Sequence, residues 1–192
     1  MKARLIIAGI VLVLAMAVAP AALAAPPCTT THVSGNWSWV NNSATITTLD
    51  NGDMLVDGDE YGTWTGTFAG SSYDVFEMTF APPLEGPEWG AAWGTLTATF
   101  KGKVGGKNGH MTMFFTIREA ANSTVMTGTW VILSGTKALK HVSGSGTWVS
   151  SGFDSSATYA GMIRWKGSDG CRLPHHEAIG SGCRQAAMRA VR

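Results

Sequence analysis

The sequence predicts an all-β domain, a single antiparallel barrel, with a short leader before it and an irregular tail after it. Three observations support this fold class. Short runs of alternating apolar and polar residues recur from Val33 to Lys166, which is the pattern of half-buried strands. Glycine-rich turn sequences separate these runs. The triplet Gly-Thr-Trp recurs at residues 62, 128 and 146, and glycine inside a strand marks the bends and close backbone approaches that barrel closure requires.

The first 24 residues have the three parts of a secretory signal peptide. Lys2 and Arg4 precede an apolar run, and Ala22-Leu23-Ala24 is a small-residue cleavage site. We expect cleavage after Ala24, which gives a secreted or periplasmic protein of a bacterial host, without membrane attachment. An uncleaved anchor helix is the alternative, because residues 5–25 are about long enough to cross a bilayer. Pro20 argues against that alternative.

The mature chain divides into a barrel domain, residues 25–166, and a tail, residues 167–192. In the first half of the domain the expected strands are Val33–Val40, Ala44–Leu49, Met54–Asp57, Gly62–Phe68 and Tyr73–Phe80. Asn51-Gly52 predicts a tight hairpin, because both residues tolerate a positive φ. We expect a second turn at Gly70-Ser71-Ser72 and a loop in the proline-rich segment 81–87.

In the second half the expected strands are Trp93–Val104, His110–Glu119, Val125–Leu133, Gly146–Ser150 and Thr158–Lys166. The runs of both halves together make about eight or nine strands. Gly105–Gly109 predicts a hairpin loop. Within the run that follows this loop, Met111, Met113, Phe115 and Ile117 form one continuous apolar face. The alternation ends at Gly167, and we expect the basic tail to be poorly ordered.

The charge is divided between the two halves of the mature chain. Residues 25–100 hold nine acids and no Lys or Arg, whereas residues 101–192 hold twelve Lys or Arg and four acids. This division can produce an acidic and a basic face, or the charges can pair across neighbouring strands. The positive residues form no dense cluster beyond Lys101, Lys103 and Lys107, so nucleic-acid binding is not expected.

Three cysteines lie in the mature part, where thiols are usually oxidised. Cys171 and Cys183 are the expected disulfide pair because they would close a short loop, and a bond from Cys28 to either one is the alternative. His175 and His176 lie between them, but the spacing matches no zinc pattern. No phosphate loop, dinucleotide fingerprint or nucleophile elbow occurs, and we expect neither a metal nor a cofactor.

A strand at residues 129–133 runs into Ser134-Gly135-Thr136-Lys137, and a glycine-rich hairpin, residues 142–148, follows. This arrangement resembles the C-terminal half of the allene oxide cyclase and dirigent-like β-barrels. Lys137 stands where the turn of that family usually has its second glycine. Residues 95–115 are similar to the paired central strands of small bacterial members, most of which have no assigned activity. The resemblance extends over residues 62–166.

The resemblance implies eight strands, frequent assembly into homo-oligomers and an apolar cavity. In the characterised cyclases and dirigent proteins, this cavity orients a reactive hydrophobic intermediate. No motif here aligns with the functional residues of those proteins, so the resemblance does not imply an activity.

Polar residues on strand faces are the remaining candidates for a cavity site. By the period of two, Tyr73 and Glu77 share one face, and His110 and Arg118 share another. A carboxyl group in an apolar cavity has a raised pKa and can act as an acid or a base, and an arginine there can hold a carboxylate. The alternative is that Glu77, His110 and Arg118 face solvent while apolar faces fill the interior.

Two groups stand out among the eight tryptophans. Trp64, Trp130 and Trp148 end the repeated triplets, and we expect a structural role for them. Trp89 and Trp93 flank the proline-rich loop and are candidates for the cavity mouth.

These features lead us to expect a secreted β-barrel that binds a small hydrophobic molecule or has a structural role. A cyclase- or isomerase-like enzyme acting in the cavity is one alternative. A small-molecule carrier similar to avidins or lipocalins is another, because Gly35-Asn36-Trp37-Ser38 resembles the start of such barrels.

Overall fold

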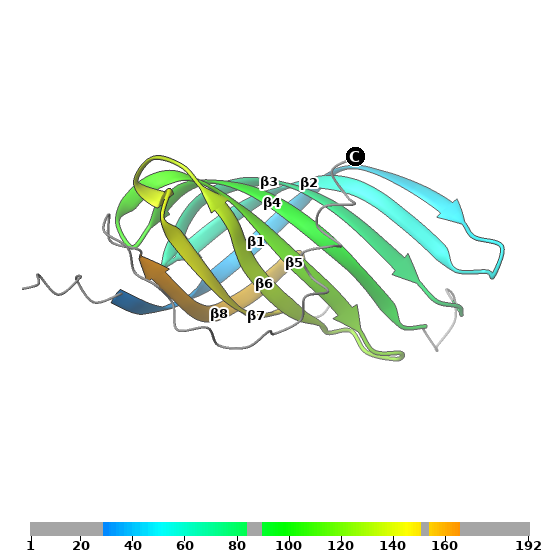
Figure 1. The fold of residues 1–192 in the computed structure, drawn as a ribbon. Coiled ribbons are helices and arrows are strands. Elements are labelled where there is room, and N and C mark those ends of the chain that lie inside the picture. The colour runs from blue at the N-terminus through cyan, green and yellow to red at the C-terminus, as the bar shows by residue number, and fades with distance from the viewer. Residues whose placement is uncertain (1–28, 84–89, 151–153, 166–192) are drawn as a thin grey trace, which may run out of the picture.

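The computed structural model describes residues 29–83, 90–150 and 154–165. Its strands are β1 (Thr29–Thr48), β2 (Met54–Gly66), β3 (Phe68–Phe80), β4 (Ala92–Val104), β5 (Lys107–Glu119), β6 (Met126–Gly135), β7 (Val142–Ser150) and β8 (Ser156–Trp165). Each strand pairs antiparallel with the next, and β8 returns to β1, so the eight strands form a closed ring in sequence order (Figure 1). The expected all-β class with antiparallel strands is confirmed.

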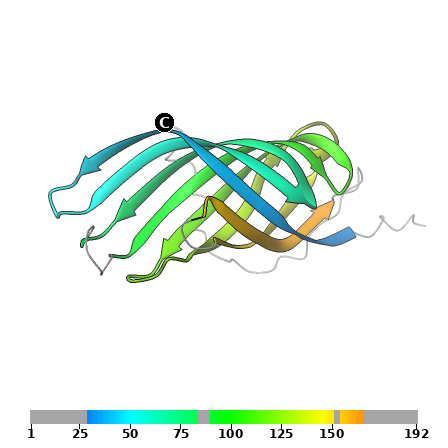
Figure 2. The same ribbon diagram turned by 180° about the vertical axis from the view of Figure 1, so that it is seen from behind.

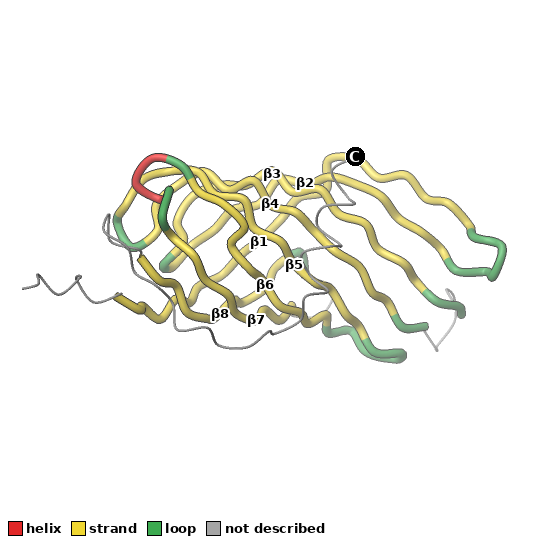
Figure 3. Tube along the Cα trace, in the orientation of Figure 1, coloured by secondary structure: helices red, strands yellow, loops and turns green. Residues whose placement is uncertain are grey.

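Helical structure within the described ranges is limited to one turn of 3-10 helix, η1 (Lys137–Leu139), between β6 and β7 (Figure 3). Lys137 begins this turn with a φ of +53°, in the left-handed region that glycine adopts most readily. A lysine therefore occupies a position for which glycine is conformationally better suited.

Strand β1 has a neighbouring strand on both sides over only part of its length. Thr29–Ser38 pairs with β8, and Gly35–Thr48 pairs with β2 (Figure 2). Beyond Trp39, whose N–H donates to the Ser155 carbonyl, the strand has β2 as its one neighbour among the described residues. The β1–β2 hairpin consequently projects past the rest of the ring at one end (Figure 1).

Several expected strands are segments of longer ones. A β-bulge between Asn41 and Ser43 joins Val33–Val40 and Ala44–Leu49 into β1. The expected turn at Gly70–Ser72 is wrong, since these residues lie inside β3 and the chain reverses at Gly66, where φ is +95°. At Gly70 a side chain has no room, because its Cβ would lie 2.7 Å from the Gly102 Cα of β4. That glycine allows close strand approach rather than a turn.

Two predicted hairpin turns are confirmed. At residues 50–53, Gly52 has a φ of +88° and its N–H donates to the Leu49 carbonyl. Gly105 and Gly106, with φ of +54° and +84°, connect β4 to β5. The second loop is shorter than expected, because residues 107–109 already belong to β5.

The repeated Gly-Thr-Trp triplet has a packing explanation. A Cβ added at Gly62 would lie 2.7 Å from Trp37 Nε1, one at Gly128 would lie 2.5 Å from Trp148 Nε1, and one at Gly146 would lie 2.6 Å from the Trp130 ring. Each glycine thus leaves the space that an indole from a neighbouring strand occupies. The three tryptophans that end the triplets are buried, as expected for a structural role.

The interior is filled at one end of the ring. We call this the closed end; it comprises the β2–β3 turn, the β4–β5 hairpin and η1. Phe68, Phe100, Val104, Leu139 and Ile163 are fully buried there. Tyr159 stacks on Phe68 with ring centroids 4.9 Å apart, accepts a hydrogen bond from the Phe68 N–H and donates one to the Thr65 carbonyl. The polar tip of this large side chain is thereby satisfied within the core.

Candidate functional site

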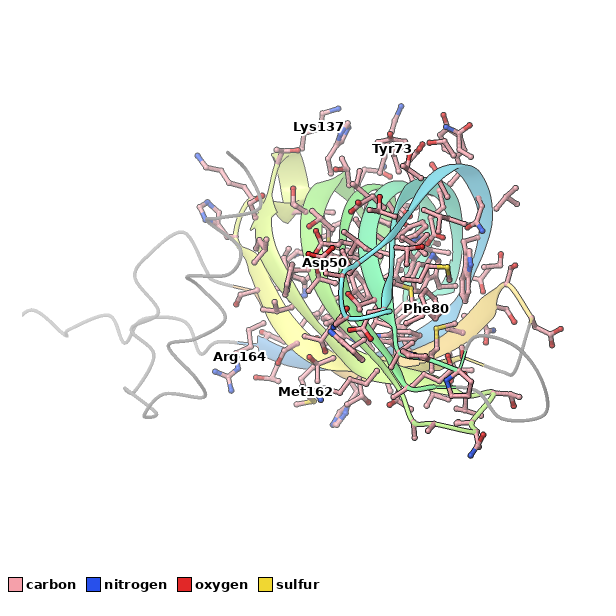
Figure 4. All side chains as sticks on the ribbon, turned by 90° about the vertical axis from the view of Figure 1, so that its right-hand side faces the viewer. Asp50, Tyr73, Phe80, Lys137, Met162 and Arg164 are labelled. Atoms are coloured by element: carbon pink, nitrogen blue, oxygen red, sulfur yellow. The ribbon has the colours of Figure 1, made fainter. Side chains whose placement is uncertain are left out.

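The opposite end of the ring, which we call the open end, contains a cavity of about 500 Å³. It is bounded by the β1–β2 hairpin, the end of β3, the start of β4, the end of β5 and the segments around Thr124 and Asp154. Figure 4 views the molecule from this end, with Phe80 at the rim. Most of the lining is aromatic or aliphatic, from Trp37, Trp39, Val56, Phe76, Met78, Phe80, Leu96, Ile117, Met126 and Trp148.

The floor of the cavity is the Trp37 ring. Trp37 stacks on Trp64 at 5.2 Å with an interplanar angle of 10°, and it meets the edge of Trp148 at 6.0 Å. Trp64 lies on the packed side of this stack and contacts Phe68 and Tyr159. The stacked pair therefore separates the cavity from the filled half of the ring.

Two carboxyl groups lie side by side on the inner face. Glu60 of β2 and Asp74 of β3 are cross-strand partners, and both side chains point into the ring, with exposed fractions of 4% and 0%. Glu60 lines the cavity, whereas Asp74 lies deeper, beside Gly62. Every Lys and Arg in the described part of the chain is exposed, and neither oxygen of Asp74 has a hydrogen-bond partner of good geometry there.

Burial of this pair favours the protonated forms. Desolvation, reinforced by the charge of Asp74, raises the pKa of Glu60 from its ordinary 4.5 to about 8. Desolvation also raises the pKa of Asp74, from 3.8 to about 7, although the nearby Ser72 hydroxyl and Trp37 indole lower it. At neutral pH the pair is thus poised to hold or release a proton, which is unusual for carboxyl groups.

The hydrogen bonds around the pair leave polar atoms unused. Trp64 Nε1 donates to the Ser72 hydroxyl at 2.8 Å, and Trp148 Nε1 donates to the Thr116 carbonyl at 3.0 Å. Trp37 Nε1 and both Asp74 carboxyl oxygens are buried without a hydrogen-bond partner of good geometry. Orphaned groups of this kind are few in native proteins and call for a functional or structural explanation.

The charged residues that line the cavity are all acidic. They are Glu60 near the floor and Glu119 and Asp154 nearer the mouth, and the described lining contains no Lys, Arg or His. Partial burial raises the pKa of Glu119 as well. The cavity therefore combines an apolar wall with an excess of carboxyl groups.

The candidates chosen from the sequence lie elsewhere. Tyr73 and Glu77 share a face as expected, but the structure places both on the outside of the ring, where Tyr73 is 44% exposed and packs beside Tyr61 (Figure 4). Trp93 is 43% exposed and stands opposite Arg118, which also points outward. His110 lies on the same outward face of β5 as Arg118 and is half-buried near the closed end.

These candidates point outward because the opposite face of β3 and of β5 is more apolar and is therefore the face that turns into the ring. On β3 the residues alternating with Glu77 are Phe76, Met78 and Phe80, and burying these three side chains outweighs burying Tyr73 and Val75. Asp74 lies on the same face of β3 as Phe76 and Met78, and it therefore also points into the ring. On β5, Met111, Met113, Phe115 and Ile117 fill the interior, which is the alternative expected from their continuous apolar face.

Glu60 and Asp74 were missed, although a signal for them exists in the sequence. Counting back by twos from Trp64 reaches Gly62 and then Glu60, and counting back from Phe76 reaches Asp74. Both acids therefore share parity with residues that must be inside.

Other expectations fall outside the described residues. These are the signal peptide, Trp89, Cys28, the Cys171–Cys183 pair and the tail. Within the described ranges, no three or more His, Cys, Asp or Glu side chains gather as a metal site requires. The same ranges contain no helix long and apolar enough to cross a membrane.

Fold and site together define a class: a small antiparallel β-ring with an apolar cavity at one end and an inward carboxyl pair. No family model and no curated protein matches the sequence. Among solved structures, the chain is similar to a protein of unknown function from the DUF3224 family of Shewanella oneidensis MR-1. That match has a TM-score of 0.56 and 15% identity, and it covers 73% of this chain and 100% of the other. It shows the shared fold.

Proposed function

We propose that this protein binds a small, largely apolar molecule in the cavity of the open end. The observation that supports this most directly is the size and character of the cavity, about 500 Å³ with a mainly aromatic and aliphatic lining. Cavities of roughly 300–1,000 Å³ with such walls and a few polar groups are the usual form of small-molecule sites. The resemblance to allene oxide cyclase and dirigent-like barrels, which enclose apolar cavities, agrees with this proposal.

A neutral fluorescent probe tests the proposal. We expect N-phenyl-1-naphthylamine to bind saturably at one site per chain. Met78→Trp should weaken this binding at least tenfold, because Met78 lines the cavity and the larger side chain would occupy it. Val75→Trp is the matched control, since Val75 lies on the same strand but faces outward, and it should bind as the wild type does. Absence of saturable binding, or equal binding by both variants, would reject the proposal.

An isomerase- or cyclase-like activity is a second candidate, and one observation favours it. The Glu60 carboxyl, with a pKa raised to about 8, faces an apolar cavity in which it can donate or accept a proton. We expect wild-type protein, and not Glu60→Gln, to convert a component of a host metabolite extract into a product of identical mass. Mass spectrometry after chromatography measures this, and identical profiles with both proteins would remove the candidate.

We also propose that the mature protein is secreted or periplasmic and begins at Ala25. The basic start, apolar run and small-residue site of residues 1–24 support this. N-terminal sequencing of protein from a bacterial periplasmic fraction should give Ala25 as the first residue, whereas a retained Met1 would show that the leader is not removed.

A further inference from the structure

We propose that the ligand of this cavity is a lipophilic organic cation, an amine whose ammonium group lies against the Glu60 carboxylate and the neighbouring indole faces. This inference depends on the proposed binding function and adds the chemical class of the ligand. It begins from the imbalance of charge inside the ring.

The inner carboxyl groups lack a positive partner. Glu60 is 96% buried and lines the cavity, and neither oxygen of Asp74 beside it has a hydrogen-bond partner of good geometry within the described residues. Every Lys and Arg in the described ranges is exposed, so none reaches the pair from within the protein. A buried carboxylate is stabilised mainly by pairing with a cation, and here the cavity is the place where one can enter.

The aromatic walls next to Glu60 suit the same ligand. Trp37 and Trp39 have ring centroids 4.8 Å apart at an angle of 42°, and Trp148 meets Trp37 edge-on. All three line the cavity. Indole faces attract ammonium groups, and the attraction is stronger in desolvated sites. A carboxylate together with several indoles therefore recognises charge and apolar bulk at once.

The rest of the cavity fits the hydrocarbon part of such a molecule. Between Glu60 and the mouth, the wall consists of Val56, Phe76, Met78 and Phe80. At the mouth, Glu119 and Asp154 add negative charge, which would draw cations toward the entrance. An anionic ligand would be repelled by the carboxyl groups of Glu119 and Asp154 at the mouth and by that of Glu60 near the floor.

Binding of a cation should be coupled to the release of a proton. Glu60 faces Asp74 on β3 and Asn41 on β1, and Glu119 and Asp154 are the other titratable residues of the described lining. In the empty cavity at pH 7 Glu60 is mostly protonated, since burial and the charge of Asp74 raise its pKa to about 8. An entering ammonium group stabilises the carboxylate and expels this proton. Amine affinity should therefore increase by up to tenfold per pH unit between pH 6 and pH 8.

Three probes of similar shape and different charge test the inference on wild-type protein. Isothermal titration calorimetry at pH 7.5 should show 4-phenylbutylamine binding at least tenfold more tightly than 4-phenyl-1-butanol. The third probe, 4-phenylbutanoate, should bind more weakly than the alcohol. Repeating the amine titration in phosphate and in Tris should show the release of about three-quarters of a proton per molecule bound, because a carboxyl with a pKa of about 8 is protonated to that extent at pH 7.5.

Two variants assign the effect to Glu60. Glu60→Gln keeps the shape of the side chain and should lose at least tenfold in amine affinity, while alcohol affinity stays within threefold of wild type. Glu77→Gln removes an acid from the outer face of the adjacent strand and should change neither.

The outcomes separate the two proposals. If the alcohol binds and the amine binds no more tightly, or if Glu60→Gln binds the amine as wild type does, the cation inference is overturned and the binding function stands. If none of the three probes binds and N-phenyl-1-naphthylamine fails as well, the binding function itself is rejected, and this inference with it.

Discussion

The two ends of the ring are built on the same strands and differ in what the inward side chains do. At the closed end, Phe68, Tyr159 and Trp130 pack edge to face and face to face, and the polar tips of Tyr159 and Trp130 have hydrogen-bond partners. At the open end, Trp37 Nε1 and Asp74 lack such partners and the ring surrounds a cavity. The closed end therefore contributes packing that stabilises the fold, whereas the open end leaves space that the inward side chains do not fill.

Charge follows the same division. Lys101, Lys103 and Lys107 lie at or near the closed end, where Lys137 begins η1 and Lys140 follows it. None of the acids of β2 and β3 stands opposite a Lys or Arg on a neighbouring strand: Glu77, for example, faces Asp57 and Thr95. The uneven charge of the sequence therefore becomes mainly a difference between two ends, instead of pairs across neighbouring strands.

The largest expected effect contrasts phenylalanines at the two ends. Phe68→Ala removes a fully buried ring that stacks on Tyr159, and it should lower the free energy of unfolding by about 3–5 kcal/mol. Phe80→Ala, at the rim of the cavity, should cost about 1 kcal/mol or less, because its ring is only partly buried. Urea unfolding measures both values. Equal losses would show that stability is shared evenly between the ends.

The second prediction concerns pH and depends on the Glu60 carboxyl at the open end. Between about pH 4.5 and pH 8 the folded chain keeps a proton on Glu60 that the unfolded chain has released, because the folded pKa is the higher one. The free energy of unfolding should therefore be greatest at the acidic end of this window. It should fall as the pH rises, by on the order of 4 kcal/mol for a pKa difference of this size.

Glu60→Gln tests this prediction. The variant cannot ionise at this position, so it should show a flatter pH dependence and should be more stable than wild type at pH 8. Glu77→Gln, on the outer face, should follow the wild-type curve. Urea midpoints at pH 5 and pH 8 are sufficient, and a wild-type midpoint that does not fall between them would contradict the assignment.

The smallest effect is expected at Lys137 in the closed end. Its φ of +53° strains a lysine and suits glycine, so Lys137→Gly should raise the free energy of unfolding by about 0.5–1 kcal/mol. The control is Lys140→Gly three residues later, where φ is −52° and glycine should destabilise instead. Stabilisation by both substitutions, or by neither, would show that the backbone conformation is not the cause.

The fold could be predicted largely from the sequence, because it depends on local patterns. The alternation of apolar and polar residues located most strand residues. The turns at Asn51-Gly52 and Gly105-Gly106 were predicted correctly, because each contains glycine at a position that requires a positive φ. The turn expected at Gly70 was wrong, because glycine also serves where two backbones approach closely, and composition does not distinguish these uses. The bulge at Asn41 likewise depends on the partner strand.

The site was less predictable, for a different reason. Parity groups residues by face but does not state which face is inside, and the more conspicuous polar residues, Glu77 and Arg118, belong to the outer one. Glu60 and Asp74 become a pair only through the register between β2 and β3. That register follows from the full set of strand pairings and is not contained in either segment alone.

The Trp37–Trp64 stack has an optical consequence. Two indoles that are nearly parallel with centroids 5.2 Å apart couple their electronic transitions, which should produce a distinct near-ultraviolet circular dichroism signal. One ring of the couple borders the cavity and the other contacts the packed half. A molecule that enters would perturb the first ring while the second stays fixed. The protein thus has a spectroscopic reporter of occupancy that requires no added label.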